Sequence, residues 1–470
     1  MTEYFVTKCK TLLKDVNVTA SIIEQHIRNP VFYEMQKKNS ELSEQVYEYL
    51  TENGEERVCD AISEEACKET PSNFLLNTIN GFSSKFAEQL ASPELIIPWI
   101  FSILGLPSFF SGLLVPVKNA GSLLPQLIVS AKIRAFPRRK YFWIGAASVQ
   151  ALVMLIIAFS LESLKDSTIG WVIVIGMLLF NVASGVASIA FKDVLGKTIS
   201  KPNRGRLLAV RATGGGVLTI LVGLFAYFFL SDHPNEAVFK WLFIGSAVLW
   251  AIAAFSFSFI SEDKGATEGG RTPIQEIKQG ASLLKRDIGF RNFLVVRGLL
   301  LSIPLVQPFL ILYADDQLGI SLSGIGFFML VTGAANTISS PIWGKFADKS
   351  SKHLMMIGGI FGGVVSMMAL LFSLIPADYQ NIYTYGPILF LMIMAYGGAR
   401  IGRKTYLVNY APENDRPLYV SVANTFIGIL VMLSALLSSI SAYFGVEVMI
   451  AVLAGLMFSA AGIAVRLRKL

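Results

Sequence analysis

The stretch Tyr141–Leu161, YFWIGAASVQALVMLIIAFSL, contains 21 residues and not one charged side chain. A helix of about 20 apolar residues spans the ~30 Å hydrocarbon core of a bilayer, so this stretch predicts a transmembrane helix. The basic run Arg138-Arg139-Lys140 precedes it directly. Because Lys and Arg are enriched in cytoplasmic loops, we expect this helix to begin on the cytoplasmic side.

Comparable apolar runs recur on both sides of this stretch. The composition agrees, since 53% of the residues are hydrophobic and 16% are charged, whereas soluble proteins hold about 25% charged residues. We predict twelve spans, at residues 73–103, 107–133, 141–161, 168–192, 207–230, 236–260, 291–315, 321–345, 353–375, 384–409, 416–441 and 444–467.

An internal repeat supports the first two spans, which a hydropathy window alone would place differently. Shifting the chain by 214 residues superposes Leu104-Gly105 on Leu318-Gly319, and shifting it by 212 superposes Gly185 on Gly397. Residues 104–107 then form a hairpin loop. Such matches indicate two six-helix halves in parallel, as in one large class of secondary transporters. The predicted fold is an all-α membrane protein with two pseudo-symmetric halves.

Four segments follow from this pattern, namely residues 1–72, the six-helix bundle 73–260, the polar linker 261–290 and the six-helix bundle 291–470. The first holds 8 Lys and Arg against 14 Asp and Glu, although the whole chain holds 40 against 33. We expect it to be a short, acidic, helical segment in the cytosol. About 70 residues bury little core by themselves, so it would rest on the membrane domain or on a cytosolic partner.

Basic residues gather in alternate loops and in the linker, whereas the opposite loops contain Asp166, Asp232 and Asp378. This asymmetry predicts a multi-pass protein of the cell (inner) membrane with both termini in the cytoplasm. A basic body would also suit nucleic acid, but short clusters between apolar runs favour cytoplasmic loops and no nucleic-acid partner. The first residues are polar and mixed in charge, so we expect no cleavable signal sequence.

The three cysteines, Cys9, Cys59 and Cys67, all lie in the acidic segment. The spacing of the last two fits no common zinc or redox motif, and we interpret all three as free thiols. The membrane domain offers no nucleophile with a suitable base, no metal-binding cluster and no nucleotide motif. We therefore expect no metal, no cofactor and no enzymatic activity.

The stretch Gly344-Lys345-Phe346-Ala347-Asp348-Lys349-Ser350-Ser351-Lys352 follows the predicted eighth span. It resembles the cytoplasmic loop motif of the major facilitator superfamily, in which a glycine is followed by an acid and then by bases. The resemblance covers residues 73–470. It implies solute transport by alternating access, with Gly344, Asp348 and Lys352 gating the cytoplasmic side. No motif assigns a subfamily, so the resemblance names no substrate.

The corresponding stretch of the first half departs from this motif. Arg134 stands where the acid should be, and Ser130 replaces the glycine. A symmetric latch is therefore not expected. The second-half stretch also fits a simpler description, a basic turn that obeys the positive-inside rule.

The first span carries a polar stripe whose members share one helical face. They are Asn77, Gly81, Ser84, Lys85, Glu88 and Ser92. Lys118 lies near the middle of the second span. Intramembrane charges cost about 2.5–3.5 kcal/mol on insertion scales, so Lys85, Glu88 and Lys118, with Asn77, are candidates for substrate binding or coupling. In two alternatives, Lys85 and Glu88 form a purely structural ion pair, or the stripe belongs to a surface helix.

The second half also places polar residues inside or near the ends of its spans. They are Arg297, Gln307, Thr332, Asn336, Tyr396, Arg400 and Asn424. We select Asn336, Gln307 and Arg297 as further substrate-binding candidates, although Arg297 would also reach the interface by snorkelling. We place Arg400 too near the cytoplasm for a central site.

Prolines interrupt corresponding spans of the two halves. Pro93 and Pro98 lie in the first span, and Pro304 and Pro308 lie in the seventh. Proline removes a helical hydrogen bond. Paired interruptions of this kind point to a binding site, although proline also serves helix packing in membranes.

The sequence thus predicts a secondary active transporter that moves a small organic solute and couples its movement to a proton or another ion. Lys85 and Lys118 outnumber Glu88, which favours an anionic or zwitterionic solute. The expected partners are this solute, the coupling ion and the lipid bilayer. The alternative is a membrane receptor or scaffold with a transporter fold that signals through residues 1–72.

Overall fold

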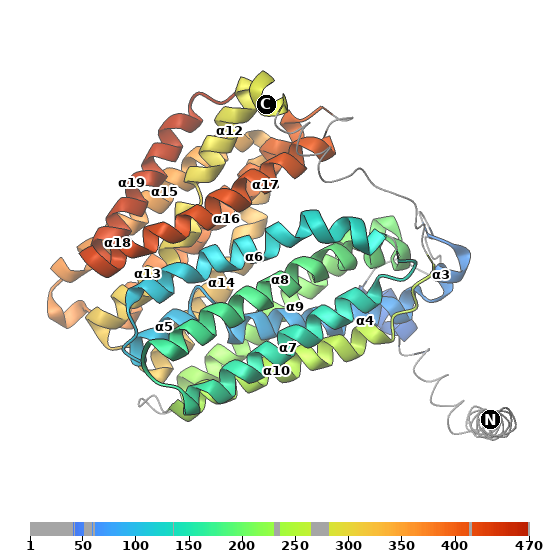
Figure 1. Cartoon of the computed structure of the whole chain (residues 1–470), viewed down its shortest axis with the longest axis horizontal. Helices are drawn as coiled ribbons and strands as arrows, with labels where there is room; N and C mark the ends of the chain where they lie inside the picture. Colours follow the sequence, from blue (N-terminus) through green and yellow to red (C-terminus); the bar gives the residue numbers. More distant parts are fainter. Residues whose placement is uncertain are drawn as a thin grey trace, which may run out of the picture.

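Figure 1 shows a computed structural model of the protein. It describes residues 41, 43–50, 59, 62–134, 136–229, 236–264, 282–412 and 416–468. These residues contain helices and no strand. The structure confirms the all-α fold of two helical halves that the sequence predicted.

Each half is a bundle of long helices. The first consists of α4 (Thr70–Leu90), α5 (Ile96–Ile103), α6 (Ser108–Arg134), α7 (Lys140–Ser163), α8 (Asp166–Thr198), α9 (Lys201–Phe229) and α10 (Glu236–Ser258). The second consists of α12 (Ile288–Leu299), α13 (Ser302–Leu318), α14 (Leu322–Lys349), α15 (Ser351–Leu370), α16 (Ile382–Tyr410), α17 (Arg416–Ser434), α18 (Ser438–Phe444) and α19 (Val446–Ala464).

Within the described residues, 10 helical segments are long and apolar enough to cross a membrane. Large apolar side chains such as Leu152, Phe225 and Phe255 are exposed on them, as expected for surfaces that face lipid. The first two predicted spans are not among the 10, and the first of them consists of two separate helices, α4 and α5. Both lie inside the bundle, where α4 packs against α9 and α10, and α6 packs along α8. The count of twelve spans stays a prediction for these two.

The two halves share an interruption and a turn. The first span breaks at residues 91–95, between α4 and α5, and the seventh breaks at Leu300–Leu301, between α12 and α13. Each following helix ends in a hairpin with a left-handed glycine, Gly105 (φ 64°) and Gly319 (φ 56°), a conformation in which glycine avoids the Cβ clash. These are the glycines that the 214-residue shift superposes, so the repeat in the sequence is a repeat in the backbone.

The halves meet at one end of the helices and diverge towards the other (Figure 1). At the meeting end α5 packs against α13, α9 against α14, and α6 against α18. Trp99 Nε1 donates a hydrogen bond to the Ile320 carbonyl at 3.2 Å. A Cβ on Gly326 would lie 2.7 Å from the Tyr227 backbone nitrogen, so only glycine permits this approach. We call this the sealed end, and the opposite end, which carries Arg139 and Lys197, the basic end.

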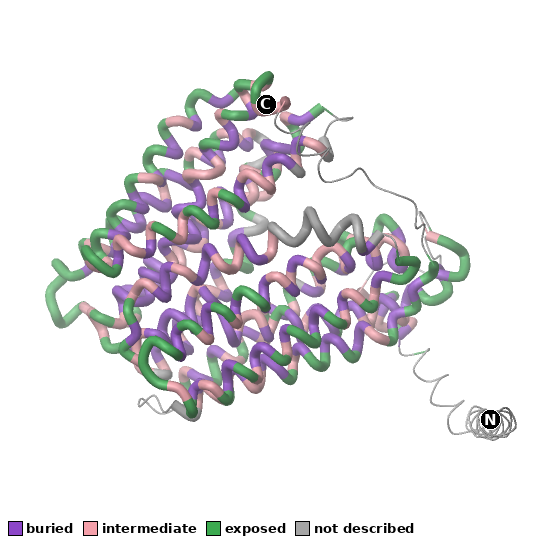
Figure 2. The backbone as a smooth tube through the Cα atoms, in the orientation of Figure 1, coloured by how far each residue is buried: buried purple, intermediate pink, exposed green. Residues whose placement is uncertain are grey.

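Burial follows the packing of each bundle, with buried positions on the helix faces that meet other helices and exposed positions around the outside (Figure 2). The interior is apolar and rich in aromatic side chains, among them Trp99, Phe243, Phe293 and Tyr385. Such interiors leave few polar groups unpaired. Charged residues inside the bundle therefore need an explanation of their own.

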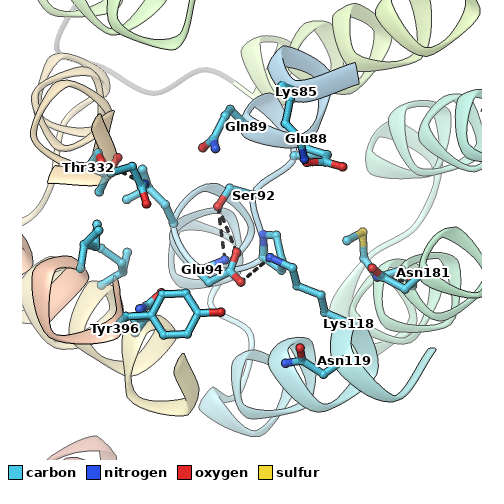
Figure 3. A pocket seen from close by; sticks show the side chains of 18 of the residues that line it. Lys85, Glu88, Gln89, Ser92, Glu94, Lys118, Asn119, Asn181, Thr332 and Tyr396 are labelled. Atoms are coloured by element: carbon cyan, nitrogen blue, oxygen red, sulfur yellow. Dashed lines mark hydrogen bonds and ion pairs between the residues drawn. The ribbon is translucent and has the colours of Figure 1, made fainter. Parts of the chain in front are cut away.

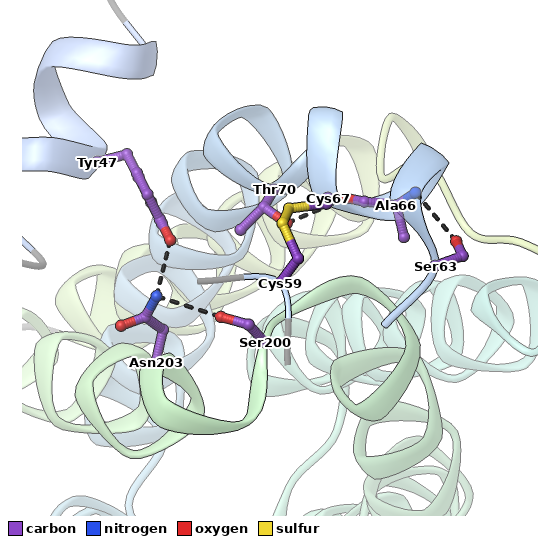
Figure 4. Close-up of a disulfide and its surroundings, with 8 residues drawn as sticks. All are labelled: Tyr47, Cys59, Ser63, Ala66, Cys67, Thr70, Ser200 and Asn203. Atoms are coloured by element: carbon purple, nitrogen blue, oxygen red, sulfur yellow. Dashed lines mark hydrogen bonds between the residues drawn. A yellow bond between two sulfur atoms is a disulfide. The ribbon is translucent and has the colours of Figure 1, made fainter. Parts of the chain in front are cut away.

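The described part of the acidic segment lies against the basic end of the first half (Figure 4). Asn203 Nδ2 donates hydrogen bonds to Tyr47 Oη at 2.7 Å and to Ser200 Oγ at 3.2 Å. The Tyr47 ring packs edge-on against Phe74. The segment thus rests on the membrane domain, one of the two arrangements expected from its small size.

Cys59 and Cys67 form a disulfide in the structure (Figure 4). The interpretation of these two residues as free thiols is therefore wrong. Their Cα atoms lie 5.6 Å apart, within the usual range for a bridge. Cys67 lies in the short helix α3 (Glu64–Lys68), directly before α4. Cys9 lies outside the described residues.

Candidate functional site

A cavity of about 460 Å³ lies between the two halves. Its lining comes from α4, the α4–α5 connection, α6 and α8 on one side, and from α13, α14 and α16 on the other. Its polar lining residues include Lys85, Glu88, Gln89, Ser92, Glu94, Lys118, Asn119, Ser122, Asn181, Ser184, Gln307, Thr332, Asn336, Tyr396 and Arg400. The volume is in the usual range of small-molecule sites.

The first half contributes two ion pairs to this cavity (Figure 3). Lys85 Nζ lies 2.7 Å from Glu88 Oε2, and Lys118 Nζ lies 2.5 Å from Glu94 Oε1. Each pair lines the cavity, so both charges of each pair are within reach of a solute. The predicted candidates Lys85, Glu88 and Lys118 therefore come together, but Lys118 has Glu94, not Glu88, as its ion-pair partner.

Sequence reasoning missed Glu94, whose position depends on the break between α4 and α5. Helix α4 ends at Leu90, and the turn that follows contains Ser92 and Pro93. The Ser92 hydroxyl accepts a hydrogen bond from the Glu94 amide at 3.4 Å and donates one to its carboxylate at 3.5 Å. Glu94 directly follows Pro93, the proline that interrupts the first span, and this position is the sequence signal that could have identified it.

The second half contributes uncharged polar groups and one arginine. Asn336 and Thr332 lie one turn apart on α14, with Asn336 Nδ2 donating to the Thr332 carbonyl at 3.0 Å. Gln307 lines the cavity from α13. Arg400 lines it from α16, with its guanidinium 5.7 Å from the centre of the Tyr396 ring. The cavity extends along α16 towards the basic end, so Arg400 belongs to its lining there, and the expectation that it lies too near the cytoplasm for a central site stays a prediction.

Two predicted candidates lie outside the cavity lining. Asn77 is buried in the first half, where Nδ2 donates to the Asn73 carbonyl at 2.9 Å and its own carbonyl accepts from Arg211 at 2.6 Å. Arg297 donates from Nη2 to Asn424 Oδ1 at 2.9 Å. Asn77 thus supports packing around Arg211, and the polar stripe of the first span divides into a packed part and a cavity part.

The predicted gating residues lie at the basic end of the second half. Lys352 Nζ donates to the Val465 carbonyl at 2.7 Å, a contact within its own half. Gly344 has open space where a Cβ would stand. The side chain of Asp348 lies outside the described part of the structure. The latch that the family resemblance implies therefore stays a prediction.

A charged network that the sequence did not reveal joins α7, α8 and the end of α10. Arg139 pairs with Asp193, and Lys197 Nζ lies 2.9 Å from Glu262 Oε1. The Glu262 carboxylate also accepts the backbone amides of Arg139 at 2.9 Å and Lys140 at 2.8 Å. Since α7 begins at Lys140 without a side-chain cap of its own, Glu262 caps this helix from a distant part of the chain.

The described residues contain no cluster of His, Cys, Asp and Glu able to hold a metal ion. In the cavity, two carboxylates, two ammonium groups and a guanidinium can bind charged groups of a solute, and the carboxylates can also exchange protons.

Comparison with known proteins finds a matching family model and distant relatives. Residues 293–470 match the family model described as Major Facilitator Superfamily. An uncharacterized protein of Mycobacterium tuberculosis and one of Mycobacterium bovis are each 21% identical to this chain over 349 residues, which cover 72% of this chain. The match spans 65% of these relatives, slightly less than two thirds of their length.

Solved structures share the fold at low identity. A variant of the nucleoside transporter NupG matches with a TM-score of 0.66 and 13% identity over 84% of this chain and 100% of its own. A POT family transporter in complex with 5-aminolevulinic acid matches at 0.64 and 13% over 83% and 95%. The inward-open xylose transporter XylE from E. coli matches at 0.56 and 12% over 84% and 96%. With the family match, they confirm the resemblance that the stretch Gly344–Lys352 indicated, and the chain is a multi-pass membrane protein with the fold of a transporter.

Proposed function

We propose that this major facilitator superfamily protein moves a small anionic or zwitterionic organic solute by alternating access and couples the movement to a proton or another ion. The observation that carries the proposal is the cavity between the halves, with paired charges on one wall and polar groups with Arg400 on the other. A solute with a carboxylate would meet Lys118 and Arg400, and an ammonium group would meet Glu88 or Glu94.

Alternating access requires that the halves separate at the sealed end and approach at the basic end. The break at residues 91–95 lines the cavity, and the seventh span, the counterpart of the first in the second half, is also broken, at Leu300–Leu301. Broken helices supply bending points close to a substrate site in transporters of several folds. We propose that the basic end faces the cytoplasm, since its loops hold the clusters of Lys and Arg.

Coupling rests on the two carboxylates of the cavity. A neighbouring ammonium favours the charged carboxylate, whereas desolvation favours the neutral acid. A solute that draws Lys85 or Lys118 towards its own anionic group would leave Glu88 or Glu94 without its partner, and proton uptake would follow. Glu88 is the coupling residue of this proposal, because its pair with Lys85 lies within one helix and survives changes between the halves.

Uptake by purified protein in lipid vesicles with an imposed pH gradient tests this function, after a thermal-shift screen of metabolites has selected ligands. Glu88→Gln mimics the protonated acid, so it should keep solute binding and exchange but lose accumulation driven by the gradient. Glu162→Gln is the control, since Glu162 pairs with Lys240 on the outside of the bundle.

Three outcomes of this experiment discriminate between coupling at Glu88, coupling elsewhere and the receptor or scaffold alternative. Accumulation by Glu88→Gln with the wild-type dependence on the gradient would place coupling elsewhere and leave Glu88 as the structural partner of Lys85. Ligand binding without any uptake or exchange would favour the receptor or scaffold alternative, with residues 1–72 as its output. Gradient-driven uptake that disappears in Glu88→Gln alone supports the proposal.

A further inference from the structure

Basic side chains gather where the cavity approaches the basic end. Arg400, Arg403 and Lys404 lie within about one turn of α16, and Arg297 lies in the last turn of α12. Lys404 is repelled by Arg400, Arg403 and Arg297, and also by Lys192 of α8. We call Arg297, Arg400, Arg403 and Lys404 the basic cluster. Arg400, its innermost member on α16, lines the cavity itself.

The basic cluster lacks counter-charges within the described part of the chain. Lys85, Lys118, Arg139 and Lys197 each have a carboxylate partner at ion-pair distance. None of the four cluster residues has one among the side chains that the structure describes. Among the described residues, Arg400 contacts the Tyr396 ring at 5.7 Å, and Arg297 donates to the amide oxygen of Asn424 at 2.9 Å.

Two hydrogen-bond donors, one in the basic cluster and one in the cavity lining, are also unused. Arg297 Nε and Gln307 Nε2 are buried and find no hydrogen-bond partner among the described residues. They lie on α12 and α13, on either side of the break at Leu300–Leu301, and Gln307 lines the cavity. Unpaired buried donors are costly, and guanidinium and amide N–H groups suit a ligand that carries only acceptors. An oxyanion is such a ligand.

The sum of the charges around the cavity favours an anionic solute over a zwitterionic one. Among the described side chains, the pairs Lys85–Glu88 and Lys118–Glu94 are each neutral in sum, and the basic cluster adds an excess of one positive charge from each of its four members, of which Arg400 lines the cavity. A zwitterion has no net charge to offset this excess. An organic solute with two negative charges offsets half of it and also supplies acceptors for Arg400 and Gln307.

We propose that the solute of this transporter is an organic oxyanion with at least two negative charges, a phosphate ester or a dicarboxylate, and that Arg400 binds one of its anionic groups at the basic end of the cavity. This rests on the proposed function, since it names the class of solute for the same cavity. Arg403, Lys404 and Arg297 contribute the positive potential that attracts the anion towards Arg400.

The test measures thermal unfolding of the full chain in a neutral detergent, with inorganic phosphate, glycerol 3-phosphate, succinate and glutamine titrated separately at constant ionic strength with chloride. Phosphate and the organic dianions should raise the melting temperature with saturation, and glutamine should not. Arg400→Gln should weaken their binding about tenfold or more, the effect of a charge-assisted hydrogen bond. Arg400→Lys should recover part of the loss.

The control is Arg291→Gln, which removes the same charge from an exposed position on α12 outside the cavity lining. It should bind phosphate like the wild type. If Arg400→Gln does not fold, Arg403→Gln is tested in its place and should weaken phosphate binding several-fold. Glycerol 3-phosphate against succinate decides between the phosphate ester and the dicarboxylate.

Opposite results overturn the inference. Equal stabilisation of wild type and Arg400→Gln by phosphate would mean that the anion does not bind at Arg400. An effect seen with vesicles of anionic lipid but not with phosphate or succinate would assign the basic cluster to lipid headgroups. Vesicle uptake of glutamine but not of either dianion would reject the dianion as the solute and leave the proposed function supported. Dianion binding without transport would reject the proposed function and leave the anion-binding site supported.

Discussion

The ion pair between Lys118 and Glu94 lies in the cavity lining, where each charge can bind an oppositely charged group of the solute. Lys118→Ala should weaken binding of an anionic solute about tenfold or more, because a charge-assisted hydrogen bond is worth about 1.5–3 kcal/mol. Titration calorimetry with a ligand from the thermal-shift screen would measure this. Lys165→Ala, at an exposed position before α8, is the control and should bind like the wild type. An unchanged affinity in Lys118→Ala would make the pair with Glu94 structural only.

Glu262 holds the network at the basic end of the first half. Its side chain is 0% exposed, whereas that of Glu162 is 54% exposed in its pair with Lys240. Glu262→Gln removes the charge that stabilises Lys197 and two backbone amides at the start of α7, and should cost about 1–3 kcal/mol of unfolding free energy. Glu162→Gln should cost less than about 1 kcal/mol, since exposed pairs contribute little.

Chemical unfolding of both variants in detergent, followed by tryptophan fluorescence, would test this difference. Equal losses would mean that Glu262 contributes no more than a surface carboxylate. The comparison is informative because both substitutions remove one carboxylate charge and keep the size of the side chain.

Single residues of the site were predictable when their chemistry depended on helical spacing alone. Lys85, Glu88 and Lys118 were found in this way, because an intramembrane charge is costly wherever it lies. Glu94 and Arg400 were not, because their positions depend on how a turn bends and on how far α16 extends beyond the cavity. The pairing of Glu262 with Lys197 joins residues 65 positions apart in the chain. No local pattern reports such contacts.

The helices α9 and α14 form much of the sealed end, and their closest approach depends on glycine. A Cβ on Gly326 would stand 2.9 Å from the Gly223 carbonyl oxygen and 2.7 Å from the Tyr227 nitrogen. Gly326→Ala should therefore force these helices apart at a cost of about 1–3 kcal/mol to the sealed state. Gly145→Ala is the control, since a Cβ there meets nothing within 4 Å.

Labelling of a single cysteine placed at Thr332, in a background without native cysteines, would measure the opening. An impermeant thiol reagent added from the sealed side should react about tenfold faster in Gly326→Ala, as expected for a shift of this size in the equilibrium between closed and open states. Labelling as slow as in the parent would show that other contacts maintain the seal.

Among the elements, the long apolar helices and the break at Pro93 were predictable. The break at Leu300–Leu301 precedes Pro304 and Pro308, which lie inside α13, and neither it nor the connections were predicted. The 214-residue shift located both hairpins because Gly105 and Gly319 are needed for the same left-handed turn. The disulfide was missed because pairing needs a Cα–Cα distance, 5.6 Å here, which spacing along the chain does not supply. The predicted start of the first span at residue 73 lies three residues inside α4, which begins at Thr70.

The orientation of the complete bundle follows from its charges and can be checked directly. A cysteine introduced at Asp378, in the exposed loop before α16, should react with an impermeant thiol reagent in intact cells. A cysteine introduced at Arg291, at the basic end, should react only after permeabilisation. The reverse pattern would invert the proposed topology, and both sites are exposed, so burial would not explain a missing reaction.

The interlocked backbones of the sealed end give the two faces of the membrane unequal access to one site. A solute arriving from the basic side meets a cavity that is already assembled, whereas one from the other side must wait for the fraction of molecules whose seal has opened. The apparent affinity for solute from that other side is reduced in proportion to that fraction. Transport in the two directions should then reach half its maximal rate at different solute concentrations, and the two maximal rates should differ by the same factor. This asymmetry alone does not drive accumulation of the solute.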